Sequence, residues 1–561
     1  MAHAIAATSD DPDYDAVVVG SGINSLVAAA MLARGGWRVC VLERNDELGG
    51  AIRTAEITEP GFQHDVFSCW HPLFVLSDAY THLGEELRSR GLRYLTTDLV
   101  AATLYPDGEA AFLSRSPEAN AVEFDHHAPG DGRAWQRDLD EFQRSADIGL
   151  GLLSTELASP AGAALALRAL RRFGRHGLVQ YSGQLLSTSR CWLQETFSSP
   201  RVHGLLAPWV LHTGVGPDAS GSGFMNRAIA SVLQTAGLPV AMGGGSRLVG
   251  ALAAIVNDQG GDCRTGTEVD RVLVSGGRAT GVRLIGGHTI TAGRAVLCNV
   301  TPPQLYDNLL ADCAIPPAAL AESRRFRFGR AGMQIHYALS DPPHWDGDDR
   351  LSRTPVIHLT PGLNGVSRAV NEADRGMLPH TATIVCGQPC AVDSSRAPKG
   401  RSILWIQLQE LPSHPIGDAA GKIDVESEVW TESLRECYAD RIQARLTHHI
   451  TNLESSILRR VTLSPADIEA ANPNLRGGDI YSGSCDLDQS FLWRPRPGLA
   501  GHRTPIRRLY QIGASTHPGP GLGAGSGEIV AHHLLGKRFT QERADAVRSR
   551  LARVSRRGTS R

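Results

Sequence analysis

The sequence predicts an α/β fold in which a dinucleotide-binding domain and a second, α+β domain are built from one chain. Three observations predict it: a βαβ unit near the N-terminus, a series of short alternating strands in the middle, and a Gly-rich loop that leads into a helix near the C-terminus. Because 561 residues are too many for a single hydrophobic core, we expect two domains whose segments interleave along the chain.

The βαβ unit begins with a buried strand and a tight turn. Residues 16–19 are AVVV, and a strand that is apolar on both faces is typical of a parallel sheet covered on two sides. The turn that follows contains Gly20, Gly22 and Ser25. Ser25 stands where the strict GxGxxG pattern has its third glycine, and a small hydroxyl side chain there should cost little in helix packing.

The unit continues with a helix, a second strand and an acid. Residues 26–34 are rich in Ala and Leu without a helix breaker, and Gly35 and Gly36 end this helix. Residues 37–42 form the second strand, and Glu43 follows it. This spacing predicts a dinucleotide site, in which a pyrophosphate lies against the glycines and the helix N-terminus while Glu43 accepts hydrogen bonds from ribose hydroxyls. An acid repels a 2′-phosphate, so the site should hold FAD or NAD and not NADP.

Composition and cysteine usage exclude other classes of protein. The net charge is -2 and the pI is near 6.9, which argues against a nucleic-acid-binding protein. The ten cysteines include no CxxC pair, and the spacing of Cys386 and Cys390 favours two packed thiols over metal ligands. Residues 1–13 lack a secretion signal and read as a disordered tail, and no run is long enough to span a membrane. We therefore expect a cytoplasmic protein without a metal site.

Residues 76–239 lack the βαβ rhythm, and we interpret them as helical. In one of the helices Leu165, Ala169 and Phe173 share a face, and arginines occupy the opposite side. Such a helix either makes a peripheral contact with an anionic membrane or presents an ordinary solvated face. The basic tail at residues 537–561, with nine Lys or Arg and two acids, has the same two interpretations.

Regular structure returns near residue 240. A Gly turn feeds a helix within residues 239–261, and three short strands follow within residues 265–300, the last of which should return to the first sheet at residues 295–298. In the Gly-rich loop 472–483, Asp479 reads as an ordinary solvated loop acid.

The C-terminal part holds the last motif. Residues 509–512 form a short strand that Gly513 ends, and a Gly-rich loop then enters a helix near Gly525. A second dinucleotide site is excluded there, because no further strand or ribose acid follows. The positive N-terminus of this helix could instead stabilise the negative charge that collects on a reduced flavin ring.

The sequence resembles the phytoene desaturase-like flavoproteins of the amine oxidase and carotenoid desaturase superfamily, which include a pyridine nucleotide-disulfide oxidoreductase domain 2-like group. The resemblance covers nearly the whole chain, because YDAVVVGSGINS, ERNDELGG, PGFQHDVFSCWHPL, TGTEVDRVLV, SRAPKG, NPNLRGGD and GASTHPGPGLGAG occur in the family's order. It implies a Rossmann-type, glutathione reductase-like FAD-binding domain interleaved with an α+β substrate-binding domain, and a non-covalent FAD. The FAD-binding domain would take residues 14–75, 240–325 and 486–536, and the substrate domain would take residues 76–239 and 326–485.

The resemblance also assigns site residues. In the family the segment ERxxxxGG passes back across the pyrophosphate, the start of TEVDRV presents backbone to the adenine, and the C-terminal Gly-rich loop meets the flavin. The cofactor-binding residues implied in this way are Gly20, Gly22, Ser25, Glu43, Arg44, Gly49, Gly50, Val269, Gly513, Ala514, Thr516, Gly523 and Ala524. If a catalytic base exists, the candidates are His64, His71 and His517, because their segments lie near the flavin ring in the family.

The activity that the resemblance implies is dehydrogenation of a carbon-carbon bond in a hydrophobic, polyene or isoprenoid-like substrate by hydride transfer to flavin N5. An amine oxidase, an isomerase or a saturase on the same scaffold, and a non-catalytic role with structural FAD, remain alternatives. The sequence leaves open whether oxygen or a quinone accepts the electrons.

Overall fold

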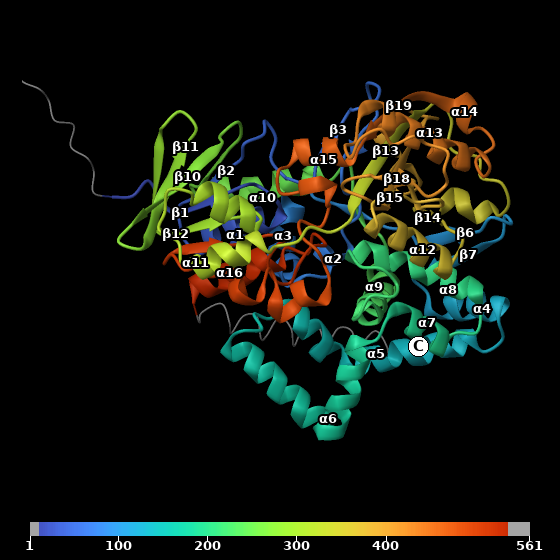
Figure 1. Cartoon of the computed structure of the whole chain (residues 1–561), viewed down its shortest axis with the longest axis horizontal. Helices are drawn as coiled ribbons and strands as arrows, with labels where there is room; N and C mark the ends of the chain where they lie inside the picture. Colours follow the sequence, from blue (N-terminus) through green and yellow to red (C-terminus); the bar gives the residue numbers. More distant parts are fainter. Residues whose placement is uncertain (1–10, 537–561) are drawn as a thin grey trace, which may run out of the picture.

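Two seven-stranded sheets form the framework of the protein. The computed structural model describes residues 11–536. Figure 1 shows the two sheets along the long axis of the molecule, with the N-terminal sheet on the left and the other on the right.

The first sheet contains the predicted βαβ unit. Its strands are β1 (Tyr14–Val19), β2 (Val39–Leu42), β9 (Asp262–Arg264), β10 (Val269–Ser275), β11 (Arg278–Leu284), β12 (Thr289–Cys298) and β20 (Leu509–Gln511). The order is β10-β11-β12-β1-β2-β9, and β20 pairs with β12. Strand β12 runs parallel to β1, with Val18 opposite Leu297, and β20 runs parallel to β12. The predicted return of the strand at residues 295–298 to this sheet is therefore confirmed, and the structure adds the C-terminal strand to the same sheet.

Helices cover both faces of this sheet, as the apolar strand predicted. Ala16 and Val18 pack under α1 (Ile23–Arg34), together with α3 (Asp78–Ser89), α10 (Ser246–Asp258) and α16 (Gly525–Leu535). Val17 and Val19 face the opposite cluster, which includes the π-helix η2 (Gln304–Leu309) and α11 (Pro317–Arg324). All four side chains are buried, as expected for a strand of a sheet that is covered on both faces.

The second sheet corrects the helical interpretation of residues 76–239. Its strands are β6 (Leu99–Leu104), β7 (Ala110–Ser114), β13 (Ala331–Leu339), β14 (Val356–Leu359), β16 (Ile384–Gly387), β17 (Ser402–Leu411) and β19 (Ile457–Leu463), in the order β19-β13-β17-β16-β14-β6-β7. Strands β6 and β7 form a hairpin whose turn holds Asp107 and Gly108, with Gly108 at a φ of 85°. An Asp-Gly pair between two short apolar runs is a hairpin signal, and here it outweighs the helical character of the residues around it.

The other helices and three small ribbons surround and connect the two sheets. The helices are α2 (Pro72–Val75), α4 (Pro117–His127), α5 (Asp131–Ser154), α6 (Pro160–Leu186), α7 (Ser189–Thr196), α8 (Pro200–Leu206), α9 (Ser222–Ala236), α12 (Leu363–Asp374), α13 (Glu432–Thr447), α14 (Leu453–Ser456) and α15 (Pro465–Ala471), with the 3-10 helix η1 (Ala207–Thr213). Three small ribbons pair β3 (Thr54–Ala55) with β4 (His64–Asp65), β5 (Tyr94–Leu95) with β8 (Val240–Ala241), and β15 (Met377–Leu378) with β18 (Gly417–Asp418). The domain boundaries themselves stay a prediction.

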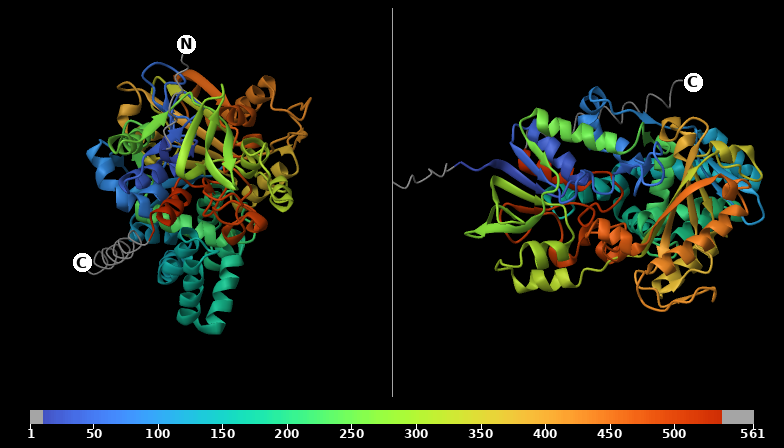
Figure 2. Two further views of the ribbon diagram at one scale, coloured as in Figure 1. Left: turned by 90° about the vertical axis from the view of Figure 1, so that its left-hand side faces the viewer. Right: turned by 90° about the horizontal axis from the view of Figure 1, so that it is seen from above.

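Helices α5 and α6 project from the body of the molecule, below it in Figure 1 and in the left view of Figure 2. Leu165 and Ala169 of α6 are buried, whereas Arg168, Arg171 and Arg175 are exposed, as the pattern predicted. A membrane contact of this helix stays a prediction. No helix within residues 11–536 is long and apolar enough to cross a membrane.

The terminal predictions fall largely outside the described residues. Of the predicted N-terminal tail, residues 1–13, residues 1–10 lie outside the described residues, and so does the whole predicted basic tail, residues 537–561. At residue 13 the chain is already held, because the Asp13 N–H donates to the hydroxyl of Thr291 at 2.9 Å.

Candidate functional site

A cavity lies between the two sheets and is lined by residues of both. One end is formed by the turn after β1, the end of β2 and the start of β10, and the other by the face of the second sheet that carries β13 and β17. We call these the dinucleotide end and the inner end.

The dinucleotide end is lined largely by backbone. Gly20 has a φ of 84°, and α1 begins directly after Gly22. Gly50, with a φ of 60°, lies against this turn, because a Cβ atom added to it would be 3.2 Å from the Cα of Gly22. The two glycine turns therefore meet, and neither Gly22 nor Gly50 places a side chain at the helix N-terminus. This arrangement suits the close approach of a pyrophosphate.

Glu43 fixes the geometry of the same loop. Its Oε2 atom accepts hydrogen bonds from the N–H of Ser21 at 3.0 Å and from the Ser21 hydroxyl at 2.6 Å, and its Oε1 atom accepts one from the Asn45 N–H at 3.0 Å. The Ser21 hydroxyl in turn accepts from the N–H of Gly49 at 2.9 Å. A carboxylate has about four acceptor positions, so one on Oε1 is left for a ribose hydroxyl.

Eight of the predicted cofactor residues line the cavity: Gly20, Gly22, Glu43, Arg44, Gly49, Gly50, Val269 and Ala514. The side chain of Arg44 is half exposed and lies 3.9 Å from the carboxylate of Glu268, next to Val269. The other five predicted residues, Ser25, Gly513, Thr516, Gly523 and Ala524, lie behind this lining. Thr516 donates to the carbonyl of Gly513 at 2.9 Å, and Ala524, with a φ of 63°, caps α16.

Asn299, at the end of β12, joins the N-terminal turn to the C-terminal loop, and sequence reasoning missed it. Its Nδ2 atom donates to the hydroxyl of Ser25 at 2.9 Å. A Cβ atom on Gly513 would lie 2.0 Å from its Oδ1 atom, and one on Gly22 would lie 3.0 Å from its Nδ2 atom. The serine in place of the usual glycine therefore has a hydrogen-bonding partner, and Gly513 is required by the close approach of Asn299.

The three histidines proposed as a base do not line the cavity. His64 is hydrogen bonded to the hydroxyl of Thr58 at 2.7 Å, and His71 to the hydroxyl of Tyr94 at 3.1 Å. Burial lowers the pKa of His64 to about 2 and the pKa values of His71 and His517 to about 4. A catalytic role for these side chains stays a prediction that no contact in the structure supports.

The inner end of the cavity is aromatic and uncharged. Trp70, Trp209 and Trp405 line it together with aliphatic residues of α9. Among the described lining residues of the whole cavity, the charged ones are Glu43, Arg44 and Glu268, all at the dinucleotide end. The inner end is therefore suited to an uncharged, largely apolar molecule.

A polar network crosses this apolar wall, and sequence reasoning missed it. It comprises Gln407 and Gln409 from β17, His212 from η1, and Tyr481, and Gln334 from β13 lies on the same wall. The signal was present, because Trp405, Gln407 and Gln409 alternate along one face of a strand whose other face is mostly apolar. Polar side chains in this position can meet a polar group of a bound molecule.

Two further groups of polar residues organise the loops around the site. Arg494 is buried and donates to the backbone carbonyls of Ala514 at 2.9 Å, Ser484 at 3.0 Å and Gln489 at 3.1 Å. Asp479, which we expected to be solvated, is also buried. It accepts three backbone hydrogen bonds, and the one from Gly329 closes a long loop at 2.8 Å. That prediction was wrong because one partner, Gly329, comes from a distant segment that packs over the loop.

A buried ion cluster connects the two sheets. Arg396 is fully buried and pairs with Asp65, and its Nε atom lies 3.2 Å from Asp393. Asp65 accepts from the N–H of Gly245 at 2.9 Å, and Asp393 accepts from the N–H of Gly243 at 2.8 Å, both just before α10. The cluster therefore ties β4, the start of α10 and the segment before β17 together.

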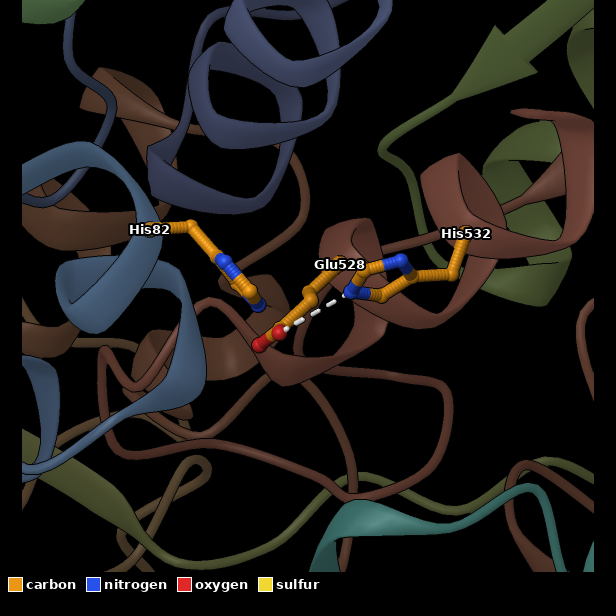
Figure 3. Close-up of side chains that lie close together, drawn as sticks. All are labelled: His82, Glu528 and His532. Carbon is orange, nitrogen blue, oxygen red and sulfur yellow. Dashed lines mark hydrogen bonds and ion pairs between the residues drawn. The ribbon is translucent and has the colours of Figure 1, made fainter. Parts of the chain in front are cut away.

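Away from the cavity, α3 and α16 bring three side chains of metal-ligand type together. Figure 3 shows His82, Glu528 and His532 directed toward one another. Glu528 and His532 are 3.4 Å apart and both are largely buried, so a hydrogen-bonded pair already satisfies this contact. Sequence spacing could not reveal the cluster, because His82 and the other two residues lie at opposite ends of the chain.

Comparisons with known proteins agree with this geometry. A family model described as an NAD(P)-binding Rossmann-like domain matches residues 18–83. The chain is 28% identical to the mouse pyridine nucleotide-disulfide oxidoreductase domain-containing protein 2, and the match covers 93% of each protein. It is 24% identical to a component of the limonene dehydrogenase of Castellaniella defragrans, over 93% of this chain and 94% of that protein. It is 25% identical to the neurosporene-forming phytoene desaturase of Cereibacter sphaeroides, over 92% and 93%.

The solved structure of cyclohexylamine oxidase from Brevibacterium oxydans has the same fold. The TM-score is 0.55 at 16% identity, and the match covers 93% of this chain and 99% of that one. Because the sequence matches extend over nearly the whole chain, they include both sheets and the cavity. The chain is thus an oxidoreductase, homologous to the phytoene desaturase-like proteins and built on the fold of the amine oxidases.

Proposed function

We propose that this protein is an FAD-dependent oxidoreductase that dehydrogenates a carbon-carbon bond of a hydrophobic substrate. The observation that carries the proposal is the cavity itself, in which a backbone-lined dinucleotide end opens into an uncharged aromatic inner end. Two relatives are named for limonene and phytoene, which are hydrocarbons, and this supports an apolar substrate here.

The described residues fit the adenosine diphosphate part of FAD. Gly22 and Gly50 would hold the pyrophosphate through backbone, and Glu43 would hold the ribose with its remaining acceptor position. The loop at Ala514, which the buried Arg494 fixes, would face the flavin ring. When bound, FAD supplies an acceptor for a hydride.

The protein itself would position the substrate and exclude water from the reacting carbon. Trp209 and Trp405 would hold the apolar substrate against the far wall, and the buried surroundings exclude water from the reacting carbon. The described lining of the inner end holds no carboxylate, and an extended polyene spreads positive charge over several carbons, so a strong base is not required.

The test is the response of the purified protein to candidate substrates. The chromophore is identified after release from the protein, and anaerobic bleaching of the flavin is then followed with apolar alkenes, with amines and with alcohols. The proposal expects bleaching by alkenes. Bleaching by amines alone would select an amine oxidase, the alternative that the fold favours, and a protein that neither contains nor binds FAD would refute the proposal. Product analysis separates desaturation from isomerisation and saturation, and reoxidation by oxygen or a quinone identifies the electron acceptor.

A further inference from the structure

The polar network at the inner end holds the amide of Gln409 in one orientation. The Tyr481 hydroxyl donates to the carbonyl of Leu211 at 2.6 Å, so it is free to accept from the Gln409 Nε2 atom at 3.0 Å. The same Nε2 atom lies 3.2 Å from the Oε1 atom of Gln407 and 3.4 Å from the Nδ1 atom of His212. The amide nitrogen of Gln409 is therefore engaged with protein groups, and this orients the other end of the amide.

The histidines behind Gln409 complete the network without adding charge. The Nε2 atoms of His212 and His358 are 3.2 Å apart, so one must donate and the other accept. Burial lowers the pKa of His212 to about 4 and the pKa of His358 well below its usual value. Both rings are therefore neutral near pH 7, and the inner end carries no charge from them.

Three polar atoms of side chains on this wall have no protein partner among the described residues. They are the Oε1 atom of Gln409 and the Nε1 atoms of Trp209 and Trp70. All three residues line the cavity, and the exposed fractions of Gln409 and Trp209 are only 5% and 3%. Buried polar atoms are rarely left without a partner, so an acceptor and a donor on the wall of a cavity indicate a missing ligand group.

We propose that the inner end binds a hydroxyl group of an otherwise apolar substrate, so that the natural substrate is an alcohol and not a pure hydrocarbon. The hydroxyl donates to Gln409 Oε1, and its oxygen can accept from Trp209 Nε1. A carbonyl or an ether could satisfy Trp209 but not Gln409, and an ammonium or carboxylate group would meet no opposite charge among the described residues of this end. The inference rests on the proposed function, which places the substrate in this cavity.

The experiment measures equilibrium binding with saturated probes that the enzyme cannot desaturate rapidly. Oxidised holoprotein is titrated with 3,7-dimethyloctan-1-ol, its methyl ether and 2,6-dimethyloctane, and binding is read from the change in the flavin absorbance spectrum. The alcohol is expected to bind roughly tenfold more tightly than the ether and the hydrocarbon. Equal binding of alcohol and ether would overturn the inference and would mean that only water occupies the two polar atoms.

A variant assigns the preference to Gln409. Gln409→Met keeps the length of the side chain and removes its amide, so the preference for the alcohol should fall to about one while the hydrocarbon binds as before. Gln143→Met, an exposed residue of α5, is the matched control and should keep the preference. A preference that survives in Gln409→Met would refute the role of this residue. If that variant does not fold, the comparison of the three probes on the wild-type protein decides.

Failure of the inference can be told apart from failure of the proposed function. On protein without flavin, binding of the same probes is read from tryptophan fluorescence, because three tryptophans line the inner end. If the protein prefers the alcohol but no alkene bleaches the flavin, the proposed hydroxyl site is supported and the proposed dehydrogenase activity is refuted. If alkenes bleach the flavin but the protein shows no preference for the alcohol, the activity is supported and the hydroxyl site is refuted.

Discussion

The two ends of the cavity are built in different ways. The centre of the dinucleotide end is made of the glycine turns between Gly20 and Gly50 and of the carboxylate of Glu43. The inner end is made of side chains that arrive from η1, α9, β13, β17 and the loop of Tyr481. A backbone-built site depends on the absence of side chains, whereas a side-chain-built site depends on their identity. The first should therefore fail when atoms are added, and the second should change its specificity when residues are exchanged.

The largest effect is expected from a single methyl group at the dinucleotide end. In Gly50→Ala the new Cβ atom lies 3.2 Å from Gly22 and the residue keeps a positive φ, so FAD content after purification should fall more than tenfold. Gly260→Ala is the control, because Gly260 also has a positive φ but no atom lies within 4 Å of its Cβ position. Equal loss in both variants would mean that backbone strain alone is responsible.

Exchange of the Glu43 carboxylate should weaken FAD binding without abolishing it. In Glu43→Gln the amide nitrogen replaces an acceptor, so a contact to Ser21 or Asn45 is lost together with the charge, and the dissociation constant should rise roughly tenfold to hundredfold. Flavin fluorescence on reconstitution measures it. Glu47→Gln, at an exposed ion pair with Arg53, should leave the constant unchanged. An unaltered constant in Glu43→Gln would remove this residue from the ribose site.

A charge at the inner end should separate the two functions of the cavity. Ile229→Glu places a carboxylate among apolar residues, so reduction of the flavin by an apolar alkene should slow by about tenfold or more, while FAD content stays at the wild-type level. Stopped-flow absorbance gives the rate, and Ile229→Leu is the control. Faster reduction by amines in the glutamate variant than in the wild type would show that the uncharged wall selects against amines.

Low pH should lower the stability of the folded protein, because several buried histidines are held in their neutral form. Burial holds the pKa values of His71, His212 and His336 at about 4, against an ordinary value of 6.5. As pH falls from 6.5 to 4 the unfolded chain binds protons that the folded chain does not, so the free energy of unfolding falls over that window. Glu410 acts in the opposite direction, because burial raises its pKa to about 7. We expect the Tm to be lower by about 5 °C or more at pH 5 than at pH 7 in scanning calorimetry. A constant Tm would contradict the neutral state of these rings.

The smallest effect is expected at Ser25, which lies behind the residues that line the cavity. Ser25→Ala removes the hydrogen bond from Asn299, so the free energy of unfolding should fall by about 1 kcal/mol while FAD content is unchanged. Urea denaturation and the flavin spectrum measure the two quantities. Loss of flavin in this variant would place the hydroxyl of Ser25 in the cofactor site itself.

The same contrast explains how much could be predicted from the sequence. The βαβ unit, the return of β12 to its sheet and the glycine turns were predicted from the sequence, because each depends on a local pattern or a short spacing. The fold of the whole chain came from the family resemblance. The alternation of Trp405, Gln407 and Gln409 along β17 is visible in the sequence, but the contact of Gln409 with His212 is not, because these residues meet only when η1 packs on the second sheet. Asp479 was misjudged for the same reason, since its partner Gly329 lies 150 residues away.

The buried cluster of Arg396, Asp65 and Asp393 has a consequence for how molecules reach the cavity. Parting the two sheets would strand a guanidinium and two carboxylates in a poorly polarisable interior, which is strongly unfavourable. Hinged opening of the kind seen in clamshell enzymes is therefore disfavoured. We therefore expect substrate and product to pass through an opening that side-chain movements alone can widen. Leu73 is half exposed, lines the cavity and packs against Gly521, so its side chain is placed to control such an opening.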